Sequence, residues 1–153
     1  MRKKSKFKMF VALAFLIAVI ILIGALFLRQ TPSQQAKKTV QSFYEYEQEA
    51  RFAESWGLFH PLMKEKFTKG HYIQDRAHVF MNHFGVTTFS YSLSNMEKVE
   101  GWSMTKDADS IGVVYATTVV QTFKGKYGTF DLHQEVFVTE VEGDWLILWD
   151  YNK

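Results

Sequence analysis

The sequence predicts an α+β fold, in which three helices pack on a curved antiparallel four-stranded sheet behind a transmembrane helix. Three observations predict it. An uncharged run of 20 residues occupies positions 9–28. Apolar residues then recur at helical spacing as far as Gly85, and beyond it they alternate as in strands. Because the helices precede the strands, we expect them to form one layer on one face of the sheet.

The amino-terminal run is long enough to cross a bilayer. At ~1.5 Å per residue, positions 9–28 span roughly 30 Å. The run is longer than the apolar part of most cleaved signal peptides and lacks a small-x-small cleavage site. Residues 1–8 hold five Lys or Arg and no acid, so they should stay in the cytoplasm. We therefore predict a basic cytoplasmic tail (1–8), a single-pass anchor in the cell membrane (9–28) and an extracytoplasmic domain (29–153).

Composition argues against two classes of function. The chain has no cysteine, which rules out disulfides, thiolate metal sites and thiol nucleophiles. Residues 29–153 carry 13 Lys or Arg against 16 Asp or Glu, a net charge of −3. A nucleic-acid-binding domain would need a basic face. We therefore expect no nucleic-acid partner.

The helices are placed by their start and stop signals. Thr31-Pro32-Ser33-Gln34 has the form of a helix start, and the helix should continue to about Ser55. A short second helix is predicted over 60–70, with His60 as its cap. A third is predicted over 71–85, where Gly85 ends it.

Four strands follow, separated by turns rich in Gly, Asp and Lys. The predicted strands are 87–105, 111–123, 129–141 and 145–151. Alternation along them assigns one face to the interior, where it meets the aromatic side of the first helix. Interior residues are predicted to be Phe43, Phe80, Phe130, Leu132, Trp145 and Trp149, with Val136, Val138, Ile147 and Tyr151.

The opposite face of the last two strands is half apolar. It is predicted to carry Phe137, Val141, Leu146 and Leu148 among Asp131, His133, Glu135 and Asp150. A sheet face left to water is normally polar. We therefore predict that Phe137, Val141, Leu146 and Leu148 form an interaction face, covered by a protein partner or by a second copy of the chain.

Three short motifs near the carboxyl end carry a family resemblance. They are Tyr127-Gly128, Gly143-Asp144-Trp145 and Trp149-Asp150. With the helix and strand order, they resemble the nuclear-transport-factor-two-like superfamily. The closest likeness is to the non-catalytic domain that follows the membrane anchor in methicillin-resistance-type penicillin-binding proteins. The resemblance extends over roughly residues 31–152, but specific identities fall only in the last thirty.

This resemblance implies a cone-shaped domain in the envelope or wall-synthesis machinery of a Gram-positive bacterium. Those relatives continue into a catalytic domain, and this sequence does not. The letters of their Ser-x-x-Lys signature occur at Ser5–Lys8 and Ser103–Lys106, but no Lys-Thr-Gly or Ser-x-Asn accompanies them. We interpret both matches as chance.

Several polar residues are candidates for catalysis or metal binding. An imidazole beside carboxylates, as in Asp131, His133 and Glu135, could move protons or hold a metal. These three side chains are predicted to point outward, so a surface charge cluster explains them better. His71, His78 and His83 lie at spacings that do not suit a shared metal. We therefore predict no catalytic residue, no metal and no cofactor, and we do not expect a small-molecule ligand.

The sequence thus favours a non-catalytic, membrane-anchored module that binds another protein outside the cytoplasm. Two alternatives stay open. One is an inner-membrane subunit of a conjugation or secretion complex, since such subunits join one membrane helix to this kind of fold. The other is a small enzyme or ligand carrier that uses a pocket in the cone.

Overall fold

The computed structural model describes residues 13, 15–19, 30–78, 85–86 and 88–152, in two compact units, Met1–Thr31 and Pro32–Lys153. In the first unit, residues 13 and 15–19 are helical and mostly exposed. Within the described ranges, no helix combines the length and the apolar character needed to cross a membrane. The predicted tail (1–8) and most of the predicted anchor (9–28) lie outside those ranges, as does Phe80.

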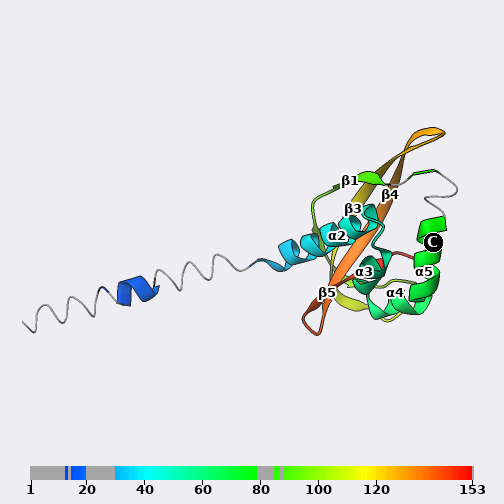
Figure 1. Cartoon of the computed structure of the whole chain (residues 1–153). Coiled ribbons are helices and arrows are strands. Elements are labelled where there is room, and N and C mark those ends of the chain that lie inside the picture. Colours follow the sequence, from blue (N-terminus) through cyan, green and yellow to red (C-terminus); the bar gives the residue numbers. More distant parts are fainter. Residues whose placement is uncertain (1–12, 14, 20–29, 79–84, 87, 153) are drawn as a thin grey trace, which may run out of the picture. The chain divides into compact units, whose positions relative to one another are not determined.

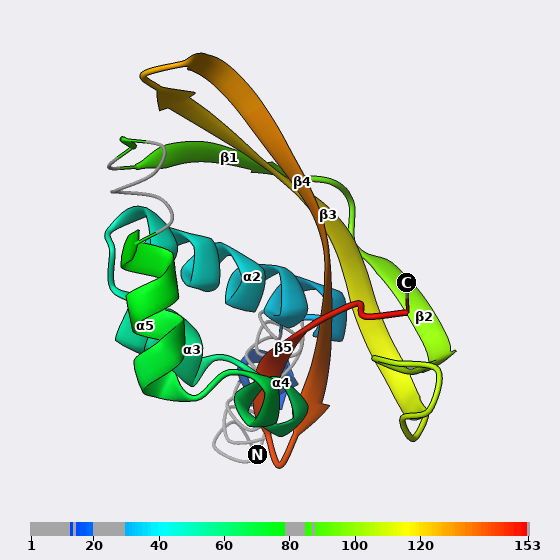
Figure 2. The same ribbon diagram turned by 90° about the vertical axis from the view of Figure 1, so that its right-hand side faces the viewer.

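The second unit is a mixed α+β domain in which helices cover the concave face of a curved antiparallel sheet (Figures 1 and 2). Its helices are α2 (Pro32–Gln48), α3 (Phe52–Gly57), α4 (Pro61–Lys66) and α5 (Lys69–Ala77). Its strands are β1 (Phe89–Leu93), β2 (Glu97–Trp102), β3 (Ile111–Gly125), β4 (Gly128–Val141) and β5 (Asp144–Trp149). The predicted α+β class is confirmed.

The sheet has five strands, so the predicted count of four is wrong. The segment predicted as one strand over 87–105 divides into β1 and β2, which pair with successive parts of β3. Ser94 lies at the break. Its backbone N–H donates to the carbonyl of Thr118, and its carbonyl accepts from the Thr117 hydroxyl at 3.0 Å. These bonds hold the chain against β3 while it bends from one strand into the next.

The two strands beside β4 differ in length, which leaves part of β4 without a second neighbouring strand among the described residues. β4 pairs with β3 from Gly128 to Val138. β5 pairs with β4 only from Val136 to Val141. Residues 131–135 therefore form a sheet edge that has no neighbouring strand on the β5 side within the described part of the chain.

α2 supplies the aromatic side of the concave core. Ala36, Val40, Phe43 and Tyr44 follow a helical repeat and are all buried. The Phe43 ring lies 5.2 Å from that of Phe59 and 6.2 Å from that of Trp149, in edge or tilted contacts that aromatic rings favour. Trp149 and Trp145 are partly buried and pack against this core. Rings therefore fill the space between α2 and the sheet.

The first helix ends earlier than predicted, at Gln48 rather than near Ser55. Ala50 adopts a left-handed conformation (φ 56°). The Ala50 N–H donates to the Glu47 carbonyl, and the Arg51 N–H donates to the Tyr46 carbonyl at 2.8 Å. This is the Schellman arrangement, which most often uses glycine or asparagine at the left-handed position. With alanine there, the sequence carried no stop signal.

Two sequence-predicted interior residues lie on the surface. Phe130 and Leu132 are 37% and 41% exposed, so the prediction of their burial is wrong. Both belong to the part of β4 that β5 does not reach, and β5 supplies much of the layer that faces α2. Phe130 stacks on the buried Phe123 at 5.1 Å, so it borders the core without being covered by it.

Two residues of the predicted interaction face are buried. Phe137 and Leu148 are 7% and 0% exposed, so the expectation that they form an open surface is wrong. The Trp102 ring stacks on Phe137 with a centroid separation of 4.2 Å. The Tyr151 N–H donates to the Met104 carbonyl at 2.9 Å, and Met104 is itself buried. The cover that the half-apolar face required is thus the chain's own segment from β2 to Met104. Val141 and Leu146 are half-buried.

Candidate functional site

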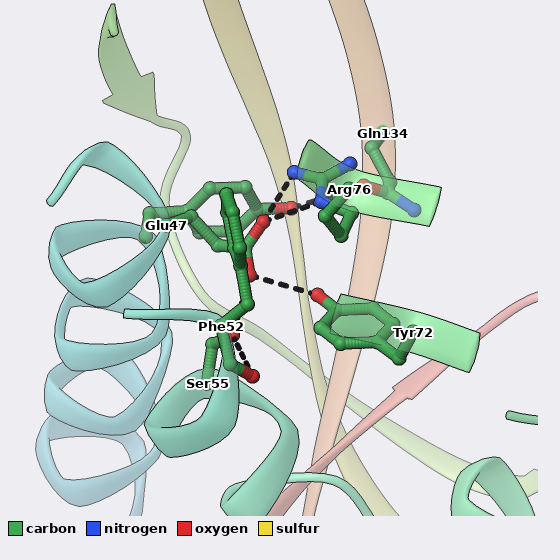
Figure 3. A network of polar contacts seen from close by, with 7 residues as sticks. Glu47, Phe52, Ser55, Tyr72, Arg76 and Gln134 are labelled. Carbon is green, nitrogen blue, oxygen red and sulfur yellow. Dashed lines mark hydrogen bonds and ion pairs between the residues drawn. The ribbon is translucent and has the colours of Figure 1, made fainter. Parts of the chain in front are cut away.

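A buried carboxylate lies at the carboxyl end of α2, where three helices meet (Figure 3). The side chain of Glu47 has no exposed surface. Its Oε1 accepts from the Tyr72 hydroxyl at 2.8 Å and contacts the Ser55 hydroxyl. Its Oε2 accepts from Arg76 Nε at 2.5 Å and also contacts Arg76 Nη2. The network joins α2 to α3 through Ser55 and to α5 through Tyr72 and Arg76.

The Arg76 guanidinium compensates the negative charge of the buried Glu47. A carboxylate at a helix carboxyl end faces the negative end of the helix dipole, which destabilises it. A guanidinium that bonds through two nitrogens offsets that charge and satisfies both carboxylate oxygens together with the hydroxyls. Removing one member of such a buried pair costs about 3–5 kcal/mol, because the other is left uncompensated.

Two phenols beside Glu47 stay protonated to unusually high pH. Burial, followed by the nearby Glu47 charge, raises the pKa of Tyr72 well above its ordinary value of 10.0. Burial also raises the pKa of Tyr44, partly opposed by the positive charge of Arg76. The Tyr44 hydroxyl donates to Gln134 Oε1 at 3.1 Å, which links α2 to β4. Both phenols therefore act as hydrogen-bond donors, not as bases.

The Glu47 network suits a structural role better than acid–base catalysis. A general base must reach a proton on a substrate, directly or through one water. Glu47 is inaccessible, and four contacts occupy its two oxygens. The arrangement fixes the three helices over the sheet.

A hollow of about 410 Å³ adjoins Arg76 on the open edge of β4. Its lining comprises Arg76, Leu132, His133, Gln134, Glu135, Trp149 and Asp150. His133 and Glu135 are exposed, as the sequence predicted for them and for Asp131. Asp131 does not line this hollow, and its carboxylate accepts from the Thr122 hydroxyl at 2.6 Å. Asp150 accepts from the Asn152 backbone N–H at 2.8 Å.

The polar side chains of this hollow do not form a metal site. Across the described residues, no three His, Cys, Asp or Glu side chains are grouped so that they could hold a metal ion. His133 and Glu135 alternate on one strand and have no hydrogen bond or ion pair to another described side chain.

Sequence reasoning missed Glu47, Tyr72 and Arg76. One signal was present. Glu47 continues the repeat of Val40, Phe43 and Tyr44, so it falls on the apolar side of the helix. Tyr72 and Arg76 lie 25 and 29 residues beyond Glu47 in the chain, and no local pattern identifies them as its partners.

A second hollow, of about 450 Å³, lies at the other end of α2. Its lining comprises Pro32, Ile111, Gly112, Val113, Tyr115, Thr139, Glu140 and Trp145. The rings of Tyr115 and Trp145 lie 5.7 Å apart. The sequence analysis does not predict a site here; it places Trp145 in the core and does not single out Tyr115 or Glu140.

No protein-family model matches the chain, and no curated protein matches it significantly.

Proposed function

We propose that this chain is a single-pass, membrane-anchored module whose extracytoplasmic domain binds another protein and does no catalysis. The setting we propose, on the resemblance described above, is the bacterial cell envelope or wall-synthesis machinery. Support for the anchor comes from the uncharged run over 9–28 and the five cations before it.

The observation that carries the binding role is the contrast between a filled interior and an open edge. Rings fill the concave side under α2, and the buried carboxylate is saturated. Over 131–135, the edge of β4 has no neighbouring strand on the β5 side among the described residues, and the exposed Leu132 lies on this stretch. Such an edge can accept an extended segment of another chain as an added strand. His133 and Glu135, on the same stretch, would select among partners by charge.

The test places a photo-crosslinking amino acid at Leu132 in the full chain, expressed in its native membrane. We expect an adduct of one discrete size, formed with a protein. The matched control carries the same group at Tyr127, which is 83% exposed at the tip of the β3–β4 hairpin. Equal adducts at both positions, or none at Leu132, would contradict binding at this edge. Extraction of the chain by an alkaline wash would contradict the anchor.

One observation favours a second candidate, a ligand carrier. The hollow beside Arg76 is bordered by Trp149 and by three titratable side chains, and Glu47 lies buried behind Arg76. Ligand pockets typically enclose about 300–1,000 Å³. A small molecule that raises the melting temperature of the full chain, but not that of its His133→Ala variant, would support this candidate over the first.

A further inference from the structure

The concave face of the sheet extends past the first residue of α2, and its end is not covered by that helix. Pro32 begins α2 and lines the 450 Å³ hollow. Tyr115 pairs with Val138, and Trp145 pairs with Glu140 two positions further along β4. Residues two apart on a strand share a face, so both rings and the Glu140 carboxylate point to the same side.

These groups form an incomplete cage. The Tyr115 and Trp145 rings meet at 5.7 Å with an interplanar angle of 61°, which leaves two ring faces at an angle to each other. Glu140 is exposed and has no ion pair or hydrogen bond to another described side chain. The one cation across from Tyr115, Lys98, is held by Glu100 at 2.5 Å. Among the described residues that line the hollow, Glu140 is the only charged one.

We propose that this hollow binds the ammonium group of a membrane lipid headgroup. Aromatic faces attract organic ammonium ions through their quadrupoles, and a carboxylate beside the rings adds a full negative charge. Part of the wall of the hollow is apolar: Val113 is 39% exposed, and Ile111 lies two residues before it on the same strand. A headgroup in the cage would bring the upper part of an acyl chain against that wall.

The choice of a lipid follows from the length of the connecting chain and rests on the proposed function, namely on the anchor. Only three residues separate Leu28, the last residue of the uncharged run, from Pro32. Four extended Cα–Cα steps reach at most about 14 Å. Pro32, which lines the hollow, is thus tethered within about 14 Å of the edge of the hydrocarbon core, close to the interface where Trp and Tyr are enriched in membrane proteins.

The test uses the full chain reconstituted in vesicles of equal parts phosphatidylethanolamine and phosphatidylglycerol. Bromine on the acyl chains of only one of the two lipids quenches nearby tryptophan. The quenching of Trp145 is obtained as the difference in quenched fluorescence between the wild type and Trp145→Phe. The control variant is Trp102→Phe, which changes a ring that stacks on Phe137. We expect brominated phosphatidylethanolamine to quench Trp145 roughly two- to fivefold more than brominated phosphatidylglycerol.

Glu140→Gln removes the carboxylate from an exposed position and should abolish this preference while the far-ultraviolet circular dichroism stays unchanged. Equal quenching by the two lipids, no quenching, or a preference that survives Glu140→Gln would each overturn the ammonium site. These outcomes leave the anchor standing if the chain still resists an alkaline wash. A chain that washes off the vesicles would overturn the proposed function and the lipid site together.

Discussion

Two carboxylates lie near opposite ends of α2, and one is buried while the other is exposed. At the carboxyl end, Glu47 is fully buried, and three side chains from two other helices surround it. At the amino end, Glu140 lies exposed beside two rings with no partner among the described residues. The helix therefore has a closed end, where Glu47 joins three helices, and an open end, beside which Glu140 of β4 stays exposed. The difference indicates that a carboxylate's contacts, and not its proximity to aromatic rings, decide its role here.

The largest effect should come from breaking the closed end. Glu47→Ala leaves Arg76 without its charge partner in a mostly buried position, so we expect a loss of about 3–5 kcal/mol in the free energy of unfolding. Urea unfolding of the full chain in detergent, followed by tryptophan fluorescence, measures this. The matched control is Glu49→Ala, two residues away, whose ion pair with Arg51 is exposed and should matter little. Equal stability of the two variants would contradict the structural role of Glu47.

Phe137 tests whether the convex face is closed by the chain itself. Phe137→Ala should cost about 3 kcal/mol, since it removes a buried ring stacked on Trp102. Leu146→Ala, at a half-buried position on the same face, should cost less. The same urea unfolding compares them. If Phe137→Ala were as stable as the wild type, Phe137 would belong to an open surface after all.

High pH should gradually lower the free energy of unfolding through the two buried phenols near the closed end. The pKa values of Tyr44 and Tyr72 are raised in the folded state, so their contribution is complete below pH ~10 and is lost as pH rises through the folded values. Above the ordinary phenol pKa, the free energy of unfolding should fall by about 1.4 kcal/mol per pH unit for each phenol.

Absorbance of tyrosinate against pH measures this directly. Tyr44 and Tyr72 should ionise only when the domain unfolds. Tyr72→Phe should remove one late-ionising group and make the fall in stability shallower. Ionisation of every tyrosine near pH 10 in the folded protein would rule out the buried phenols.

The smallest change in stability should come from a substitution of Glu140 at the open end. Glu140→Gln should change the free energy of unfolding by no more than about 0.5 kcal/mol, because the carboxylate bonds to no other described side chain. The urea measurement used for Glu47 suffices. A loss comparable to that of Glu47→Ala would mean that Glu140 also holds the fold together, and the contrast between the two ends would disappear.

Local patterns predicted much of the fold. Alternation identified the strands, and Glu142-Gly143 forms the predicted tight turn, with both residues at positive φ. His60 caps α4, as predicted: its Nδ1 accepts from the Leu62 N–H at 3.2 Å. Each of these features depends on residues close together in the sequence.

The failures share a different cause. Alternation identifies the face of a side chain but not the extent of the layer opposite it. Leu132 lies beyond the reach of β5, and Phe137 lies under Trp102, which comes from a distant strand. The Glu47 network likewise depends on contacts between separate helices. Long-range geometry of this kind has no counterpart in the spacing of neighbouring residues.

The segment between α3 and α4 has a consequence for the order of folding. Phe59 forms a parallel bridge with Ile147: the Ile147 N–H donates to the Leu58 carbonyl, and the His60 N–H donates to the Ile147 carbonyl, each at 2.9 Å. β5 thus inserts between this segment and β4, both of which the ribosome makes earlier. Until β5 emerges, the backbone groups on either side of the gap stay unpaired. β5 must therefore be synthesised before this bridge and the β4–β5 pairs can form.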